Sequence, residues 1–402
     1  MARKYRSITA LALSLISAAH AHAEGMLELE PYVSAGMTYD DNVFRVSGKN
    51  EARALLGDDA TSDTTQRLEA GIHADLKLSR QHFRLDLSAN QSRFDRFGFL
   101  DNEGDSSKLA WDWQFGNHLG GALSVSEDTS MGGFTELQNP VLNMRTRKRQ
   151  LATVNWGLHP RWRLRAIGEE VDVENSLESY RSSDRTESIR EIGVQHRTPQ
   201  GSQVGLFGRQ IDSEYAQRDV FSLVLFGNAN RQQELGVDLA WVPGGKSRVE
   251  GRFARVERKY EELSGRDFSG WSGRASVFWQ ATGKTAMSLS AARDIYGVDD
   301  LAATYAQTDT LSFIPSWMPT SKISVQGRAT YERRNYLGDP SLVIAGAEQR
   351  EDIVKVAGLS VSYVPYYKVS MQLSWQTESR ESSVRGAGYD ASSLTANLRA
   401  EF

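Results

Sequence analysis

Apolar and polar residues alternate along most of the chain beyond its first two dozen residues. In the segment 67–78, Leu68, Ile72 and Leu76 share one parity, whereas Arg67 and Asp75 share the other. The same period of two residues recurs further along the chain, in the segments 235–241, 271–280, 323–332 and 369–376. Because successive residues of a strand point to opposite faces, this period predicts β-strands with one apolar and one polar face.

The connections between these strands are alternately short and long. Short turns are expected near Arg80, Asn117, Pro160, Pro199, Pro243, Thr282, Pro319 and Pro365, and longer polar loops at 40–64, 127–146, 213–231, 333–352 and 378–390. Five of the nine prolines lie in these turns, where a missing N–H does least harm. With a first strand at 27–39 and a last at 392–402, the pattern predicts a transmembrane up-and-down barrel of about eighteen antiparallel strands, with short periplasmic turns and long extracellular loops.

Tryptophans occur at one level of this predicted barrel. Those close to a short turn and on the apolar parity are Trp113, Trp156, Trp162, Trp241, Trp279 and Trp317. An indole prefers a membrane interface, so these residues predict an aromatic girdle. Soluble sandwiches would need a second apolar layer and a domain break, and a propeller would repeat a sequence motif. Neither feature is present in the sequence.

Both ends of the chain carry export signals. Arg3, Lys4 and Arg6 precede a short apolar run at 8–19 and the small-residue pattern that ends at Ala23. That run is too short to span a bilayer, so residues 1–23 are expected to be a cleaved signal peptide and residues 24–402 the barrel. The chain ends in an alternating strand whose last residue is Phe402, which is typical of the C-terminal strand that the outer-membrane β-barrel assembly machinery recognises.

Composition removes several classes of function. The chain has no cysteine, which excludes disulfides, thiolate zinc sites and cysteine nucleophiles. Its net charge of −4 gives no indication of a nucleic-acid partner. Mean hydropathy is −0.48, which by itself would indicate a soluble protein. A membrane barrel has similar hydropathy, because only every second strand residue faces lipid.

No motif for catalysis or cofactor binding is present. The sequence Gly283-Lys284-Thr285 resembles the end of a phosphate loop, but Phe278 stands where the required glycine would be. Acidic pairs such as the one at Asp40 are interpreted as solvated loop charge rather than as a metal site. We therefore expect a protein that is not an enzyme and that has no cofactor and no metal.

The polar parity of the strands supplies candidates for contact with a solute. Arginines expected to face the lumen are Arg163, Arg165, Arg248, Arg252, Arg274 and Arg328. Guanidinium groups bind carboxylates and sugar hydroxyls well. The alternative is that these side chains only hydrate the lumen and pair across strands. The sequence leaves both interpretations open.

The segment 131–140 is the most distinctive loop. It mixes glycines with Phe134 and runs into a basic cluster that includes Arg145 and Arg147. One hypothesis is a loop folded into the lumen as a constriction, with the basic cluster lining it. The other is an exposed loop with a solvated run of charge, since long loops are often functional but usually on the surface.

The opening of the mature chain carries a family resemblance. The segment from Tyr39 to Arg45 reads Tyr-Asp-Asp-Asn-Val-Phe-Arg, and together with the terminal Phe402 it resembles the EpsL-type β-barrel porin family of exopolysaccharide operons. The resemblance implies export or assembly of an exopolysaccharide beside periplasmic and inner-membrane proteins. It implies no catalytic residues. On the residues alone, Phe44 is expected to tuck its loop onto the barrel rim.

Four hypotheses on function follow from these observations. The first is a passive conduit for an exopolysaccharide, with outer-membrane lipid, the assembly machinery, the polysaccharide and periplasmic export proteins as partners. The second is a general or small-solute porin. The third is a barrel-embedded lipid hydrolase, and the fourth is a scaffold whose own loops close the lumen.

Overall fold

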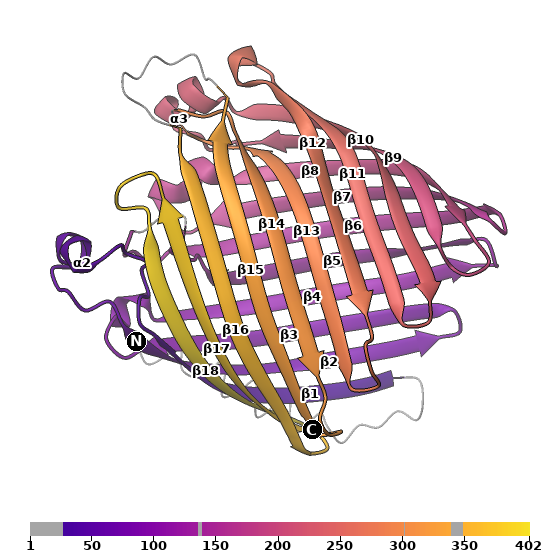
Figure 1. The fold of residues 1–402 in the computed structure, drawn as a ribbon, viewed down its shortest axis with the longest axis horizontal. Coiled ribbons are helices and arrows are strands. Elements are labelled where there is room, and N and C mark those ends of the chain that lie inside the picture. Colours follow the sequence, from indigo (N-terminus) through magenta and orange to yellow (C-terminus); the bar gives the residue numbers. More distant parts are fainter. Residues whose placement is uncertain (1–26, 136–138, 301, 339–348) are drawn as a thin grey trace.

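The computed structural model describes residues 27–135, 139–300, 302–338 and 349–402, where the chain forms one 18-stranded antiparallel sheet (Figure 1). The sheet closes because the first strand pairs with the last, with Ala35 opposite Leu398. Closure leaves no unpaired edge, which a bilayer requires because lipid offers backbone groups no hydrogen-bond partner. The predicted transmembrane barrel is thereby confirmed, whereas the expected signal peptide, residues 1–23, lies outside the described residues.

Each strand pairs with its neighbours in chain order. The strands are β1 (Leu27–Asp40), β2 (Asp63–Leu78), β3 (Gln81–Phe94), β4 (Asn102–Phe115), β5 (Leu119–Met131), β6 (Met144–His159), β7 (Trp162–Asn175), β8 (Arg185–Arg197), β9 (Gln203–Glu214), β10 (Ala229–Gly244), β11 (Ser247–Tyr260), β12 (Phe268–Trp279), β13 (Thr285–Gly297), β14 (Tyr305–Trp317), β15 (Ile323–Leu337), β16 (Glu351–Tyr366), β17 (Val369–Ser382) and β18 (Tyr389–Glu401).

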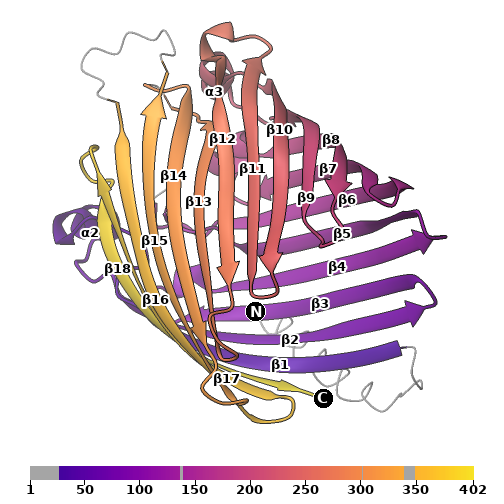
Figure 2. The same cartoon turned by 45° about the vertical axis from the view of Figure 1, so that its right-hand side comes forward.

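Short turns join the strands at one end of the barrel and longer loops join them at the other (Figure 2). All the expected short turns are present. The loops carry the helices α2 (Lys49–Leu56) and α3 (Val220–Phe226) and the 3-10 turns Gly98–Leu100, Glu178–Ser183 and Ser264–Arg266. Within the described residues, neither helix is long and apolar enough to cross a membrane.

All five long loops are shorter than the sequence predicts, and three of them markedly so. β5 runs to Met131 and β6 begins at Met144, so the loop expected at 127–146 is wrong at both ends. The loops expected at 333–352 and 378–390 are shortened in the same way by β15, β16, β17 and β18. The reason is that strand pairing continues beyond the apolar band into water, where both faces are polar and the alternation disappears from the sequence.

The outward face of the barrel is an apolar band. Leu206, Val237 and Phe253 lie side by side in register on β9, β10 and β11 and are 59%, 41% and 49% exposed. Such a continuous exposed apolar surface is unusual for a soluble monomer and is typical of a lipid-facing band.

The predicted aromatic girdle is present at the short-turn end of this band. The tryptophans that are about half exposed there are Trp156, Trp162, Trp241, Trp279 and Trp317. Trp113 is partly covered by Phe115, with ring centroids 5.3 Å apart. Their placement gives each ring an apolar neighbourhood with water close by, as an indole at an interface requires.

A small hydrophobic core lies among the loops after β1, β3 and β5. We call it the loop roof: Phe44, Val46, Ala52, Phe97, Leu100 and Phe134. The Phe44 ring is fully buried, with its centroid 4.8 Å from those of both Phe97 and Phe134. Beside it, Arg45 makes an ion pair with Asp40 at 2.9 Å. The expectation that Phe44 tucks its loop onto the rim is therefore confirmed.

A second group of loops is joined by two buried arginines. The Arg218 side chain, after β9, lies over the Tyr215 ring and makes an ion pair of 2.8 Å with Asp299, after β13. Arg266, after β11, donates to the carbonyls of Val298 at 2.6 Å and Ala303 at 3.0 Å. Burial raises the pKa of the Tyr215 hydroxyl, and the Asp299 carboxylate raises it further. These contacts fix three loops to one another at the long-loop end.

Candidate functional site: the lumen wall

The lumen face consists of the strand residues of opposite parity to the exposed apolar ones. On β6 and β7, Trp156 and Leu164 point outward and are paired in register. Arg149 on β6 and Glu169 on β7 have the opposite parity and make an ion pair across the inside of the wall, with Nε 2.7 Å from Oε1. This parity, followed from strand to strand through the register, assigns every inward residue below.

One wall of the lumen is rich in arginine. We call it the arginine face: the inward arginines of β6, β7 and β8, which are Arg145, Arg147, Arg149, Arg163, Arg165, Arg185 and Arg197. Arg145 and Arg147 lie near the long-loop end of β6, whereas Arg163 and Arg165 lie at the short-turn end of β7. The arginine face therefore extends from one mouth of the barrel towards the other.

Most members of the arginine face have no protein partner. Arg149 pairs with Glu169, and Arg185 pairs with Glu187 at 2.8 Å. In the part of the chain that the structure describes, the other five have no side-chain hydrogen bond and no ion pair: Arg145, Arg147, Arg163, Arg165 and Arg197. A guanidinium that faces water without a carboxylate remains available to an anion in the lumen.

The opposite wall is lined by hydroxyl groups. We call it the hydroxyl face: the inward serines and threonines of β13–β18, which are Ser288, Ser290, Thr308, Thr310, Ser312, Ser316, Ser324, Thr330, Ser360, Ser362, Ser370, Ser374, Ser382, Ser393 and Thr395. Neighbours bond across the strands, as Ser360 and Ser374 do at 3.0 Å. Gln372 donates to Ser360 at 2.8 Å. By strand order this face lies half the circumference away from the arginine face.

Between these walls, side chains of β8–β11 form a network of an ion pair and a cation–π contact. Arg252 on β11 reaches across two strands to Glu191 on β8, with Nη2 2.7 Å from Oε2, and its guanidinium lies 3.6 Å from the centroid of the Phe207 ring. The Glu191 side chain is only 7% exposed. A Cβ at Gly236 would lie 2.7 Å from that ring, so this position needs glycine. Arg252 therefore links β11 to β8 and is not free to bind a solute.

The six lumen arginines named from the sequence all lie on the inward parity, in two groups. One group has carboxylate partners: Arg252 pairs with Glu191, Arg248 with Glu250 at 2.6 Å, and Arg274 with Asp294 at 3.6 Å. A second group has no ion pair among the described residues: Arg163, Arg165 and Arg328. Only this second group has its full hydrogen-bonding capacity free for a solute.

The residues proposed for a constriction are separated by the structure. Arg145 and Arg147 lie in β6 rather than in the loop, and Phe134 is buried in the loop roof. The loop nevertheless reaches over the mouth, because the carbonyl of Thr135 accepts a hydrogen bond of 2.6 Å from Nη1 of Arg380 on β17. Since β18 and β1–β4 separate β17 from β5, this contact covers one sector of the opening.

Carboxylates near the short-turn end of β2–β4 mostly have a histidine or arginine partner. His82 bonds Asp75 at 2.6 Å, His73 bonds Asp86 at 2.5 Å, and Arg84 pairs with Asp112. At the start of β1, Glu28 and Glu30 have no such partner within the described residues. Asp128 on β5, opposite Arg147 in register, also has no ion pair among the described residues, so both carboxylates and guanidinium groups without ion pairs face the lumen.

Other expected sites have a simple structural setting. Within the described ranges, no group of three metal-ligating side chains lies together. Phe402 lies at the short-turn end, 41% exposed, and its N–H donates to the carbonyl of Pro31 at 2.9 Å. The last residue therefore helps to close the seam between β18 and β1.

Comparison with known proteins places the fold but not the family. No protein-family model and no curated protein matches this sequence. The chain is similar to the solved structure of OccK2 (OpdF) of Pseudomonas aeruginosa, at 11% identity and a TM-score of 0.51, covering 94% of this chain and all of that one. It is also similar to OccK1 (OpdK) of the same organism, at 10% identity and a TM-score of 0.49, with 94% and 100% covered. The fold is that of an outer-membrane porin barrel.

Sequence reasoning missed two features of the site. It did not separate paired from free arginines, because the partner of Arg252 is 61 positions away and is set by register. It also did not single out the hydroxyl face, because serine on the polar parity of any one strand is unremarkable. The signal that could have shown it is the repetition of serine or threonine at that parity on six consecutive strands.

Proposed function

We propose that this chain is an outer-membrane channel through which small anionic solutes that carry hydroxyl groups diffuse passively. The observation that best supports this proposal is the arginine face, with five guanidinium groups that have no partner among the described residues. It lies opposite the hydroxyl face in a closed 18-stranded barrel. A barrel of this strand number leaves a lumen wider than side chains can fill. Outer-membrane lipid and the β-barrel assembly machinery are the partners that such a channel requires.

The two walls divide the recognition of such a solute. Leaving bulk water costs a carboxylate or phosphate part of its hydration, and forked guanidinium groups replace it with paired hydrogen bonds. Hydroxyl groups both donate and accept, so the opposite wall exchanges hydrogen bonds with the hydroxyls of the solute. Because the arginines recur along the barrel, the solute passes between several weak sites, as conduction requires.

A swelling assay with purified protein in liposomes tests this function. We expect a six-carbon sugar acid to enter several-fold faster than the neutral sugar of the same size. The variant Arg163→Gln/Arg165→Gln should remove this preference, whereas Arg231→Gln, an outward arginine paired with Asp212, should retain it. Equal entry of acid and neutral sugar through the unaltered protein would contradict the proposal.

Export of an exopolysaccharide is the second candidate, and the hydroxyl face favours it. Those hydroxyls lie on six consecutive strands at several levels of the wall, as contact with an extended sugar chain would require. For this candidate, current blocks should lengthen steadily with the number of sugar units in an added oligosaccharide. A deletion strain should also lose surface polysaccharide. Short blocks independent of length, with unchanged surface polysaccharide, would leave only the small-solute channel.

A lipid hydrolase and a closed scaffold make different predictions from a channel. A hydrolase would release fatty acid from phospholipid vesicles, and a scaffold would show no ion current. We expect intact lipid and a measurable current from the same protein preparation.

A further inference from the structure

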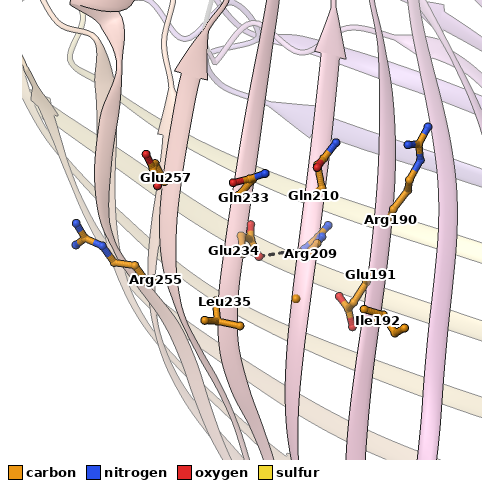
Figure 3. A pocket seen from close by; sticks show the side chains of 11 residues that line it. Arg190, Glu191, Ile192, Arg209, Gln210, Gln233, Glu234, Leu235, Arg255 and Glu257 are labelled. Carbon is orange, nitrogen blue, oxygen red and sulfur yellow. Dashed lines mark ion pairs between the residues drawn. The ribbon is translucent and has the colours of Figure 1, made fainter.

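The outer surface of the barrel contains a polar hollow at the edge of the apolar band that is nearer the long loops. The hollow has a volume of about 520 Å³ and is lined by β8–β11 (Figure 3). The lining side chains of outward parity are Arg190, Ile192, Gln210, Gln233, Leu235, Arg255 and Glu257. Three residues of inward parity also border it: Arg209 and Glu234, which form an ion pair of 3.8 Å, and Glu191, which pairs with Arg252. Most of the lining therefore lies on the lipid side of the barrel wall.

The register across these strands shows how the surface changes from apolar to polar. One row, Val194–Leu206–Val237–Phe253, is wholly apolar. The next row towards the long loops is Ile192–Gly208–Leu235–Arg255, and the one after it is Arg190–Gln210–Gln233–Glu257. In an outer-membrane barrel, this transition on the long-loop side lies at the level of the outer-leaflet headgroups.

Gly208 creates the depth of the hollow. It stands between Ile192 and Leu235, whose side chains are 66% and 72% exposed, and a Cβ added to it would meet no atom within 4 Å. The position has ordinary backbone geometry, since Gly208 is not among the residues with positive φ. A missing side chain between two aliphatic ones leaves a slot of the kind that an acyl chain fills.

The two arginines of the hollow differ from the other basic residues of the outer surface. Elsewhere at this level a cation has a carboxylate beside it, as in Arg231–Asp212 at 2.5 Å, Arg293–Asp309 at 2.6 Å, Arg333–Glu351 at 2.8 Å and Lys355–Glu381 at 2.5 Å. Among the described residues, Arg190 makes no ion pair, although the Asp212 carboxylate, which pairs with Arg231, is near enough to attract it, and Arg255 donates only to the Ser269 hydroxyl, at 2.7 Å. Arg255 also lies 5.7 Å from the ring centroid of Trp271.

Two acidic residues border the hollow without neutralising these arginines. Glu257 pairs instead with Lys259, at 3.0 Å. Glu170 lines a neighbouring hollow of about 460 Å³ that shares Arg190, and no ion pair joins the two within the described residues. Two exposed guanidinium groups beside an apolar slot thus make no direct ion pair among the described residues.

We propose that this hollow binds a phosphorylated lipid of the outer leaflet, with the phosphate held by Arg190 and Arg255 and an acyl chain lying over Gly208. Guanidinium groups bind phosphate through paired hydrogen bonds, and the amides of Gln210 and Gln233 add donors beside them. The aliphatic side chains of Ile192 and Leu235 cover the chain below the headgroup. The inference rests on the outer-membrane location proposed above, but not on what passes through the lumen.

Native mass spectrometry of the detergent-solubilised protein tests the site. The probes are a diphosphorylated disaccharide lipid with several acyl chains, the same lipid without phosphates, and inorganic phosphate alone. We expect the diphosphorylated lipid to bind at least about tenfold more tightly than the dephosphorylated one, since a hydrogen bond to a charged group is worth more than a neutral one. Equal binding of the two lipids, or displacement of the lipid by millimolar inorganic phosphate, would overturn the proposal.

Variants assign the binding to these side chains. Arg190→Gln/Arg255→Gln should weaken lipid binding by on the order of tenfold or more, and Gly208→Leu should weaken it by filling the slot. Arg293→Gln/Arg333→Gln, which removes two paired arginines of the outer surface, is the matched control and should bind as the unaltered protein does. Unchanged binding by both hollow variants would exclude the site.

The ion current through each variant keeps this test separate from the proposed channel function. All substituted side chains point outward, so each variant should conduct as the unaltered protein does. Loss of current in all proteins with retained lipid binding would count against the channel alone. Loss of lipid specificity with retained current would count against the lipid site alone.

Discussion

The two walls of the lumen use polar side chains in opposite ways. Most charges of the arginine face have no ion pair among the described residues. The hydroxyl groups of the opposite face partly bond to one another, as Ser360 and Ser374 do. A free guanidinium acts on an anion over several ångströms, while a hydroxyl acts only on contact. Under the proposed function, selection by charge and selection by hydroxyl groups would lie largely on different strands of one barrel.

Removing the free charges should have the largest effect on transport. The variant Arg145→Gln/Arg147→Gln/Arg163→Gln/Arg165→Gln should reduce the entry rate of a sugar acid by about tenfold, because charge-assisted contacts are lost along the whole wall. Liposome swelling measures this rate, with the neutral sugar as internal control. An acid rate within twofold of the unaltered protein would show that the arginine face does not select solutes.

Substituting a paired arginine should affect stability instead. Arg252→Ala leaves the buried carboxylate of Glu191 without a partner, and we expect a loss of about 1–3 kcal/mol in the free energy of unfolding. Arg163→Ala, which breaks no contact within the described residues, should change it by less than about 0.5 kcal/mol. Urea-induced unfolding in lipid vesicles distinguishes the two. Equal losses would remove the distinction between paired and free arginines.

The loop roof offers a local test at one mouth. Phe134→Ala removes a buried ring that contacts Phe44, and we expect about 2 kcal/mol less protection of the backbone amides of Val43 and Val46 from hydrogen exchange. Leu55→Ala is the control, because that side chain is 41% exposed and is not part of the loop roof. Unchanged protection in the Phe134 variant would mean that the roof does not hold these loops together.

Changes to the hydroxyl face should be smaller than changes to the arginine face. Ser360→Ala/Ser374→Ala removes one hydroxyl pair, which is worth about 1 kcal/mol at most to a passing solute. The sugar acid and the neutral sugar should therefore slow alike, by about twofold, with their ratio unchanged. A changed ratio would show that charge and hydroxyl selection are not separated on the two walls.

The smallest expected effect is on pH dependence at the long-loop end. Hydrogen bonds from the Ser222 N–H and from nearby hydroxyls hold the pKa of Asp219, which caps α3, below its ordinary value. Because the pKa is lowered in the folded protein, the carboxylate stabilises the cap at every pH above its ordinary pKa, about 3.9. This stabilisation is lost as the pH falls from that value through the lowered pKa. Spin-label mobility at residue 224 should rise only below about pH 4. Asp219→Asn should remove this dependence, and a rise above pH 5 would contradict it.

The strand layout could be predicted from the sequence because lipid enforces it. Each membrane-spanning residue faces either lipid or water, so period two, the turn positions and the strand number follow from pattern alone. Strand ends beyond the lipid were placed less well, as at Met131 and Met144, since there both faces are wet. Pairing was not predictable, because the contact of Arg252 with Glu191 depends on register and on the ring of Phe207 between them.

The central claim is that the lumen is open and that the arginine face makes it select anions. The most direct measurement is the reversal potential of single channels of the purified protein in a salt gradient. The five free guanidinium groups of the arginine face predict a measurable conductance with a clear preference for anions. A preference for cations, or no conductance at all, would contradict the account.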